Sequence, residues 1–246
     1  MGNSYDRYRI CADEVIEKGY LFMKFGKLLF KVSVTIIIGV ILIAALIFIP
    51  AGTLNFWQGW LFLGTLFIPM ICVMFFMFKY ERRLLEKRIN AKEKRPEQAW
   101  IQAVNTILVI VMAVIAGLDH RFSWSRMPVW SVLTSAVLML AGYIMFIKIM
   151  LYNEYASRTI EIQRGQKLIS TGPYAVIRHP MYTAGIFLYI FVPLTLGSLW
   201  ALIPMLFLPF TLMLRVIDEE KALIKGLKGY KQYMKKVKYR LMPGVW

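Results

Sequence analysis

The chain has 246 residues, 59% of them apolar, and carries a formal net charge of +16 at pH 7. Its long uncharged stretches and mean hydropathy of +0.57 exclude a soluble globular protein and indicate one that uses the lipid bilayer as its solvent. The charge does not require nucleic acid, because membrane topology and attraction to anionic lipid headgroups both explain it.

The first part of the chain predicts an interfacial segment followed by membrane spans. Residues 5–27 mix aromatic and aliphatic side chains with both signs of charge, which favours a helix in the membrane interface over a cleavable signal peptide. Four apolar stretches of about 20 residues follow, each long enough to cross a hydrocarbon core of about 30 Å. These predicted spanning helices are residues 32–50, 57–78, 100–118 and 129–147.

A fifth apolar stretch, residues 185–214, is too long for one straight crossing. The residues that interrupt it are Pro193, Gly197, Pro204 and Pro209. It could cross once, tilted, or turn back near Leu196-Gly197-Ser198 as two short helices. Lys and Arg accumulate in cytoplasmic loops, and only the hairpin places 27 of the 30 basic residues on one side. We therefore predict an all-α, polytopic membrane bundle of four spanning helices, a C-terminal helical hairpin and a cytosolic tail, with both termini cytoplasmic.

The residues that could hold a metal are few. Cys11 and Cys72 cannot form a disulfide framework or a thiolate metal site, and the predicted topology places His120 and His179 on opposite membrane faces. We expect no metal and no nucleic acid among the partners. No internal repeat or linker marks a second domain. We therefore expect one structural unit, with the interfacial and membrane helices in residues 1–147 and the chemistry in residues 148–246.

The candidate functional residues surround the fifth apolar stretch. They are Gly172-Pro173-Tyr174, Arg178-His179-Pro180-Met181-Tyr182, Arg215 followed by Asp218-Glu219-Glu220, and the pair Tyr230 and Tyr233. Ionisable groups beside a membrane-buried stretch carry a high desolvation cost and are functional hypotheses by default. Pro180 disfavours the helical region at His179, so a helix should begin there. The unpaired N–H groups of such a helix start favour an anionic group such as a carboxylate.

In this order the motifs resemble the isoprenylcysteine carboxyl methyltransferase and phospholipid methyltransferase superfamily, over roughly residues 148–246. The resemblance implies an integral membrane methyltransferase that binds S-adenosylmethionine between its last helices and its tail, without a Rossmann fold; no Gly-x-Gly-x-x-Gly loop is present. By position it implies cofactor contacts from Gln166, Leu168, Ile169, Tyr174, His179, Pro180, Met181, Tyr182 and Glu219. It also aligns Arg215 with the arginine that faces the substrate carboxylate in the isoprenylcysteine enzymes.

The chemistry of the cofactor supports and extends this set. S-adenosylmethionine presents a sulfonium cation, an ammonium, a carboxylate and an adenine. The groups that could meet the first three are tyrosine faces, with Tyr230 and Tyr233 as candidates, then Glu219 or Glu220, then Arg178 or the helix start. Methyl transfer in a water-poor site depends mainly on alignment, so a dedicated general base is not required.

Each of these candidates also has a purely structural alternative. Arg178 could be a topology charge, Arg215 and Glu219 an i,i+4 ion pair on a helix surface, and the paired tyrosines interface anchors. An NADPH-dependent sterol or enone reductase, and a transporter or scaffold with a broken helix, are the alternative function classes. The methyl acceptor is expected to be a lipophilic small molecule or a membrane lipid. Amines, thiols and carboxylic acids all fit, and Arg215 favours a carboxylate.

Overall fold

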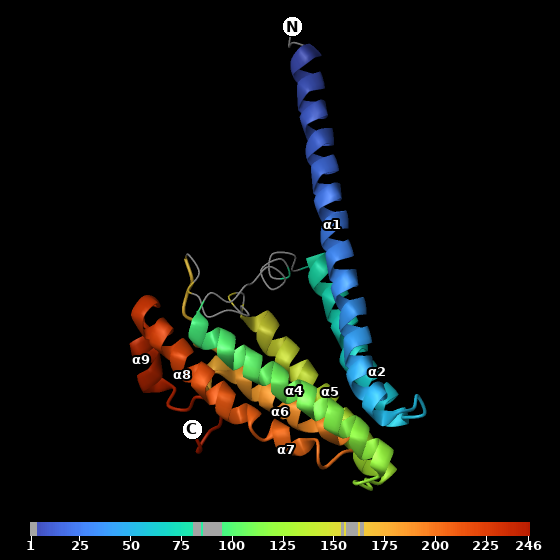
Figure 1. Cartoon of the computed structure of the whole chain (residues 1–246). Coiled ribbons are helices and arrows are strands. Elements are labelled where there is room, and N and C mark those ends of the chain that lie inside the picture. Colours follow the sequence, from blue (N-terminus) through green and yellow to red (C-terminus); the bar gives the residue numbers. More distant parts are fainter. Residues whose placement is uncertain (1–3, 81–84, 86–94, 154, 156–161, 163–164) are drawn as a thin grey trace. The chain divides into compact units, whose positions relative to one another are not determined.

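The computed structural model describes residues 4–80, 85, 95–153, 155, 162 and 165–246. All the regular elements in these ranges are helices, which confirms the all-α class (Figure 1). The chain divides into two compact units, Met1–Leu42 and Ile43–Trp246. The residues outside these ranges are 1–3 at the start of the chain, 81–84 and 86–94 before the third predicted span, and 154, 156–161 and 163–164 after the fourth.

The first unit belongs to helix α1 (Ser4–Ala51). This helix has no break between the segment expected to lie in the interface and the first predicted span, so the two are one continuous helix. Its apolar part, Leu29–Ala51, is long enough to cross a membrane. The interfacial position of residues 5–27 stays a prediction.

The second unit contains the other predicted spans. They are α2 (Trp57–Tyr80), α4 (Pro96–Phe122) and α5 (Val129–Tyr152), each long and apolar enough to span a bilayer. Each observed helix equals or exceeds its predicted apolar stretch, because backbone hydrogen bonding continues where the apolar sequence ends. α4 begins with Pro96, whose fixed φ suits a first helical position. With α1, the four predicted spanning helices are confirmed, as expected of an integral membrane protein.

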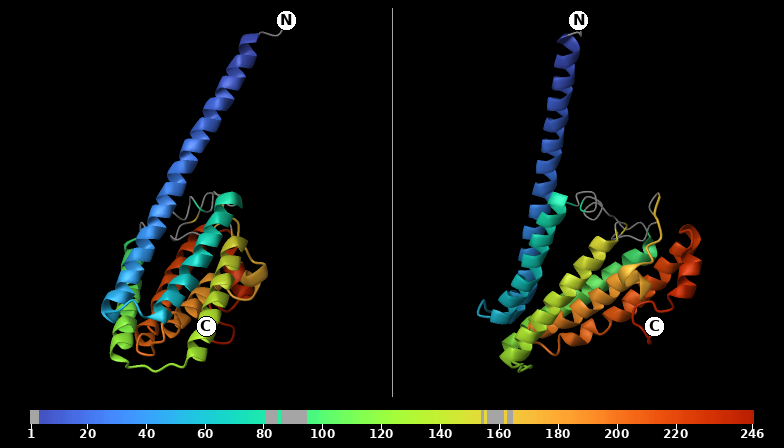
Figure 2. Two further views of the ribbon diagram at one scale, coloured as in Figure 1. Left: turned by 90° about the vertical axis from the view of Figure 1, so that its right-hand side faces the viewer. Right: turned by 180° about the vertical axis from the view of Figure 1, so that it is seen from behind.

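The predicted hairpin is also confirmed. It consists of α6 (Pro180–Thr195), the short α7 (Leu202–Met205) and α8 (Leu208–Gly226). The chain reverses at Gly197, whose φ of +74° lies in the left-handed region. Helices α4, α5, α6 and α8 run side by side in all three views (Figures 1 and 2).

A buried carboxylate holds this reversal. Asp119, near the end of α4, is 2% exposed and accepts hydrogen bonds from the backbone N–H of Ser125 at 2.6 Å and from its hydroxyl at 2.7 Å. The hydroxyl of Ser198 in the hairpin turn donates to the same carboxylate. The turn therefore returns to the level of the α4–α5 connection, where Trp124 and Trp200 are exposed, as is common at a membrane interface.

Close helix packing fixes how the hairpin lies on the bundle. α5 packs along α6 at Gly142, where a Cβ atom would lie 2.9 Å from the Phe187 ring and 3.1 Å from the Leu188 Cα. Small residues allow such close approach between membrane helices. On the other side, Asp218 of α8 accepts from Arg95 Nη1 at 2.9 Å and from Gln98 Nε2 at 2.7 Å at the start of α4. These contacts limit rotation of α8 about its axis.

The chain after α8 folds back on the start of α6. Helix α9 (Tyr230–Lys236) is followed by residues 237–246, which we call the C-terminal strap. The strap accepts hydrogen bonds from Arg178 N at Tyr239 O (3.0 Å), from His179 N at Arg240 O (2.9 Å) and from Thr183 Oγ1 at Leu241 O (2.6 Å). The motif residues that precede and follow the hairpin therefore meet at one end of the bundle.

Candidate active site

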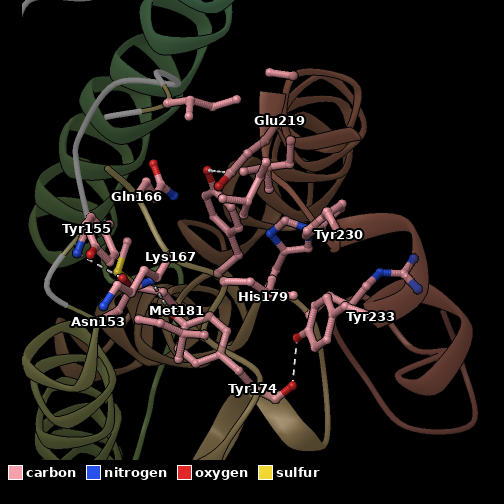
Figure 3. A pocket seen from close by; sticks show the side chains of 18 of the residues that line it. Asn153, Tyr155, Gln166, Lys167, Tyr174, His179, Met181, Glu219, Tyr230 and Tyr233 are labelled. Carbon is pink, nitrogen blue, oxygen red and sulfur yellow. Dashed lines mark hydrogen bonds between the residues drawn. The ribbon is translucent and has the colours of Figure 1, made fainter. Parts of the chain in front are cut away.

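One cavity joins the two sides of the hairpin. It is lined by the start of α6, by α8 and α9, and by the segment before the short 3₁₀ helix η1 (Gly172–Ala175). In the view of Figure 3, Glu219 lies towards one end, Tyr174 and Tyr233 towards the other, and His179 between them. The predicted site residues that line it are Gln166, Leu168, Ile169, Tyr174, Arg178, His179, Met181, Tyr182, Arg215, Glu219, Tyr230 and Tyr233. Pro180 and Glu220 do not.

Sequence reasoning missed several lining residues. They are Asn153, Tyr155, Ile162, Lys167, Ala222, Leu223 and Leu227. The helical spacing offered a signal for Ala222 and Leu223, which stand three and four residues after Glu219 and so share its face of α8. Asn153 had no such signal: it comes from the end of α5, and its side-chain amide donates to the Tyr174 hydroxyl at 2.9 Å.

Helix α6 begins at the predicted residue, and two backbone amides just before it are hydrogen-bonded within the protein. The helix begins at Pro180, with His179 as the preceding cap residue, as predicted. However, the backbone N–H groups of Arg178 and His179 donate to strap carbonyls. These two amides are therefore already used within the protein, and the binding of an anion by the other N–H groups of this helix start stays a prediction.

The adjacent glutamates occupy different surroundings, and Glu220 is the buried one. Its side chain is 4% exposed; Oε1 accepts from Arg178 Nε at 2.7 Å and lies 3.3 Å from His179 Nε2, while Oε2 accepts from Arg240 Nε at 2.8 Å. Burial by itself raises the pKa of this carboxyl, but the hydrogen bonds from His179, Arg240 and Arg178 outweigh it and lower the pKa to about 2. Glu220 is thus a buried, ionised carboxylate that holds Arg178, His179 and Arg240 together.

Glu219 instead lines the cavity and joins a short hydrogen-bonded chain. The Tyr182 hydroxyl donates to Glu219 Oε2 at 2.7 Å and accepts from Arg215 Nε at 3.0 Å. Arg215 and Glu219 stand one turn apart on α8, so the i,i+4 pair weighed from the sequence is bridged by a residue of α6. Because Arg215 is 9% exposed, the pair is not a solvated surface feature.

The aromatic part of the cavity is packed rather than solvent-facing. Tyr230 and Tyr233 are 3% and 4% exposed and belong to an apolar cluster with Leu227 and Val237, unlike aromatic anchors at a membrane surface. The Tyr233 hydroxyl donates to the Tyr174 carbonyl at 2.6 Å (Figure 3). Burial raises the pKa of both tyrosines, so their hydroxyls stay protonated. The Tyr230 hydroxyl is buried without a hydrogen-bond partner among the described residues.

Taken with the helical spans, these contacts describe a polytopic membrane protein with a charged and aromatic cavity at one end of its helical bundle. Residues 130–229 match the family model described as phospholipid methyltransferase. This match confirms the predicted resemblance, because the matched family is part of the isoprenylcysteine carboxyl methyltransferase superfamily of integral membrane methyltransferases. A comparison with curated proteins found no significant match.

The family match bears on the function classes left open by the sequence. It supports a membrane methyltransferase rather than a reductase, transporter or scaffold. In the part of the chain that the structure describes, no group of three or more His, Cys, Asp or Glu side chains could hold a metal ion. The absence of a metal from the reaction stays a prediction.

Proposed function

We propose that the protein transfers a methyl group from S-adenosylmethionine to a lipophilic or membrane-partitioned acceptor. The observation that carries the proposal is that His179 and Glu219, from the two sides of the hairpin, line one cavity within the region matched by the methyltransferase family. The other residues that line this cavity include the charged, aromatic and apolar side chains that this methyl donor requires.

The side chains present fit the donor group by group. Glu219 is a half-buried carboxylate suited to an ammonium, and the faces of Tyr174, Tyr230 and Tyr233 suit a cation or an adenine ring. Leu168 and Ile169 provide an apolar wall. Bound there, S-adenosylmethionine supplies an electrophilic methyl group on a positively charged sulfur. The protein binds and orients the methyl donor and the acceptor and excludes water from the site. This is sufficient for an in-line displacement in which the charges of the reacting groups cancel.

Between the two glutamates, we assign the ligand contact to Glu219. Glu220 already accepts hydrogen bonds from Arg178 and Arg240 and lies beside His179, so its lone pairs are committed to the protein. Arg178 is likewise engaged, because its Nη1 donates to the carbonyls of Val237 (2.8 Å) and Lys238 (2.9 Å). We therefore propose that Arg178 and Glu220 shape the cavity rather than hold the ligand directly.

Ligand-dependent thermal stability in detergent tests the proposal. A ligand present at about 100 times its Kd should stabilise the fold by about 2.7 kcal/mol. We expect S-adenosylhomocysteine to raise the Tm of the wild-type protein and NADPH to leave it unchanged. Glu219→Gln should reduce the shift, while Glu97→Gln, an exposed carboxylate at the start of α4, serves as the matched control. Stabilisation by NADPH alone would overturn the proposal.

For the acceptor we propose a carboxylate, held by Arg215. This guanidinium lines the same cavity one turn from Glu219 and is almost fully buried, which strengthens its attraction for an anion. Incubating the protein with a radiolabelled methyl donor and total lipid extract should yield a base-labile methyl ester. Arg215→Ala should lower turnover while S-adenosylhomocysteine affinity is retained. Label recovered in an amine headgroup, with Arg215→Ala fully active, would replace the carboxylate with an amine.

A further inference from the structure

The C-terminal strap lies outside the matched region, which ends at residue 229. Residues 237–246 are all described, and none of them lines the cavity. The strap nevertheless contacts both sides of the hairpin, through backbone carbonyls that accept from the start of α6 and through the Arg240 side chain, which reaches Glu220 on α8.

Arg240 is the residue that joins these two contacts. Its Nε donates to Glu220 Oε2 at 2.8 Å, and its carbonyl accepts from His179 N at 2.9 Å. Its own N–H donates to the Trp246 carbonyl at 2.8 Å, and its guanidinium lies 4.7 Å from the centroid of the Trp246 ring. Backbone and side chain are therefore both fixed, and the donor is held in place towards Glu220.

Through Glu220, the contact with Arg240 affects two residues that line the cavity, Glu219 and His179. Successive helical residues point about 100° apart, so holding Glu220 towards the strap turns Glu219 away from it, towards the cavity. On its other oxygen, Glu220 lies 3.3 Å from His179 Nε2, and the His179 ring lines the cavity. Loss of Arg240 would leave Oε2 without its donor in a side chain that is 4% exposed, a costly state that favours rearrangement of this turn.

We propose that Arg240 is a positioning residue for the cofactor cavity, acting through Glu220 on Glu219 and His179. This inference rests on the proposed function, that the cavity binds S-adenosylmethionine. Arg240 touches no ligand in this proposal; it fixes the geometry of the two residues that do.

The test is the Kd for S-adenosylhomocysteine, measured by calorimetry in detergent. One well-placed hydrogen bond to a charged ligand group is worth about tenfold or more in affinity, so we expect Arg240→Gln, which displaces Glu219, to weaken binding by about tenfold or more. Arg240→Lys should restore part of the affinity, because it keeps a donor and a charge. Lys238→Gln, which removes an exposed charge two residues away, is the matched control and should bind as the wild type does.

A double-mutant cycle separates positioning from a general loss of stability. If Arg240 acts through Glu220, Arg240→Gln should change the Kd by less than about twofold when added to Glu220→Gln. The KM for the acceptor should stay unchanged in Arg240→Gln. If that variant does not fold, the same cycle can be measured with Arg240→Lys or with Trp246→Leu, which removes the ring beside the guanidinium. We expect both to weaken the binding of S-adenosylhomocysteine less than Arg240→Gln does.

The possible outcomes are distinct. Wild-type affinity in Arg240→Gln, an equal loss in Lys238→Gln, or fully additive effects with Glu220→Gln would each overturn the positioning role. Failure of the wild-type protein to bind S-adenosylhomocysteine would instead overturn the proposed function on which this inference rests.

Discussion

The Tyr182 hydroxyl, at the start of α6, donates a 2.7 Å hydrogen bond to Glu219 Oε2 on α8. The oxygen of this hydroxyl also accepts from Arg215 Nε at 3.0 Å. One hydroxyl thus links the carboxylate proposed to hold the methyl donor with the arginine proposed to hold the acceptor. It also ties the two arms of the hairpin together beside the cavity.

Tyr182→Phe tests this link. Because hydrogen bonds to charged groups contribute about 1.5–3 kcal/mol, we expect S-adenosylhomocysteine affinity to fall by about tenfold or more. Calorimetry in detergent measures the change. Tyr189→Phe, an exposed tyrosine on the same helix, is the control and should leave affinity unchanged. Equal affinity in the wild type and Tyr182→Phe would show that the hydroxyl does not orient Glu219 for binding.

Neutralising Glu219 should mainly affect ligand binding, whereas neutralising Glu220 should mainly affect the stability of the fold. Glu219→Gln should weaken S-adenosylhomocysteine binding and hardly change the Tm of the unliganded protein, since Glu219 lines the cavity. Glu220→Gln should lower the Tm strongly, because breaking a buried ion pair costs about 3–5 kcal/mol. Thermal melts with and without ligand measure both. The assignment is reversed if Glu220→Gln melts normally and only its ligand shift is lost.

Stability should depend on Glu220 at acid pH. The pKa of its carboxyl is lowered from 4.5 to about 2 in the folded protein, so its contribution to stability is fully present above pH 4.5 and is lost as pH falls towards 2. The Tm gap between the wild type and Glu220→Gln should therefore be constant near neutral pH and narrow below pH 4.5. A gap that widens on acidification would contradict this.

The two buried tyrosines of α9 should respond differently to loss of the hydroxyl. Tyr233→Phe removes a donor to the Tyr174 carbonyl and should destabilise the protein by about 1–3 kcal/mol. Tyr230→Phe removes a buried hydroxyl that has no partner among the described residues, and should be neutral or stabilising without ligand. Melting curves of the unliganded variants compare them directly, and equal destabilisation would contradict the different roles.

Asp119 should control the reversal of the hairpin. Asp119→Asn weakens hydrogen bonds from Ser125 and Ser198 and replaces an acceptor oxygen with a donor, so we expect a loss of about 1–3 kcal/mol. Limited proteolysis at the turn, around Leu199, should become faster, whereas S-adenosylhomocysteine affinity should change little because this turn lies at the other end of the hairpin. Unchanged melting and proteolysis would show that helix packing alone fixes the turn.

The features of this protein that depend on composition and periodicity could be predicted from its amino-acid sequence alone. The length of apolar stretches predicted the four spans, and the asymmetry of basic residues chose the hairpin with its turn at Gly197. The order of motifs from Tyr174 to Tyr233 resembles that of a methyltransferase superfamily, and this resemblance implied which residues would come together. That part of the prediction required no knowledge of side-chain packing.

The different roles of those residues depend on how the helices pack against one another. Glu219 and Glu220 are adjacent and chemically alike, and which one faces the cavity depends on the rotation of α8, fixed by Asp218 against α4 and by Arg240 of the strap. The same holds for Tyr230 and Tyr233, of which only the second meets a carbonyl among the described residues. Contacts between segments far apart in the chain set these orientations, and no local sequence pattern encodes them.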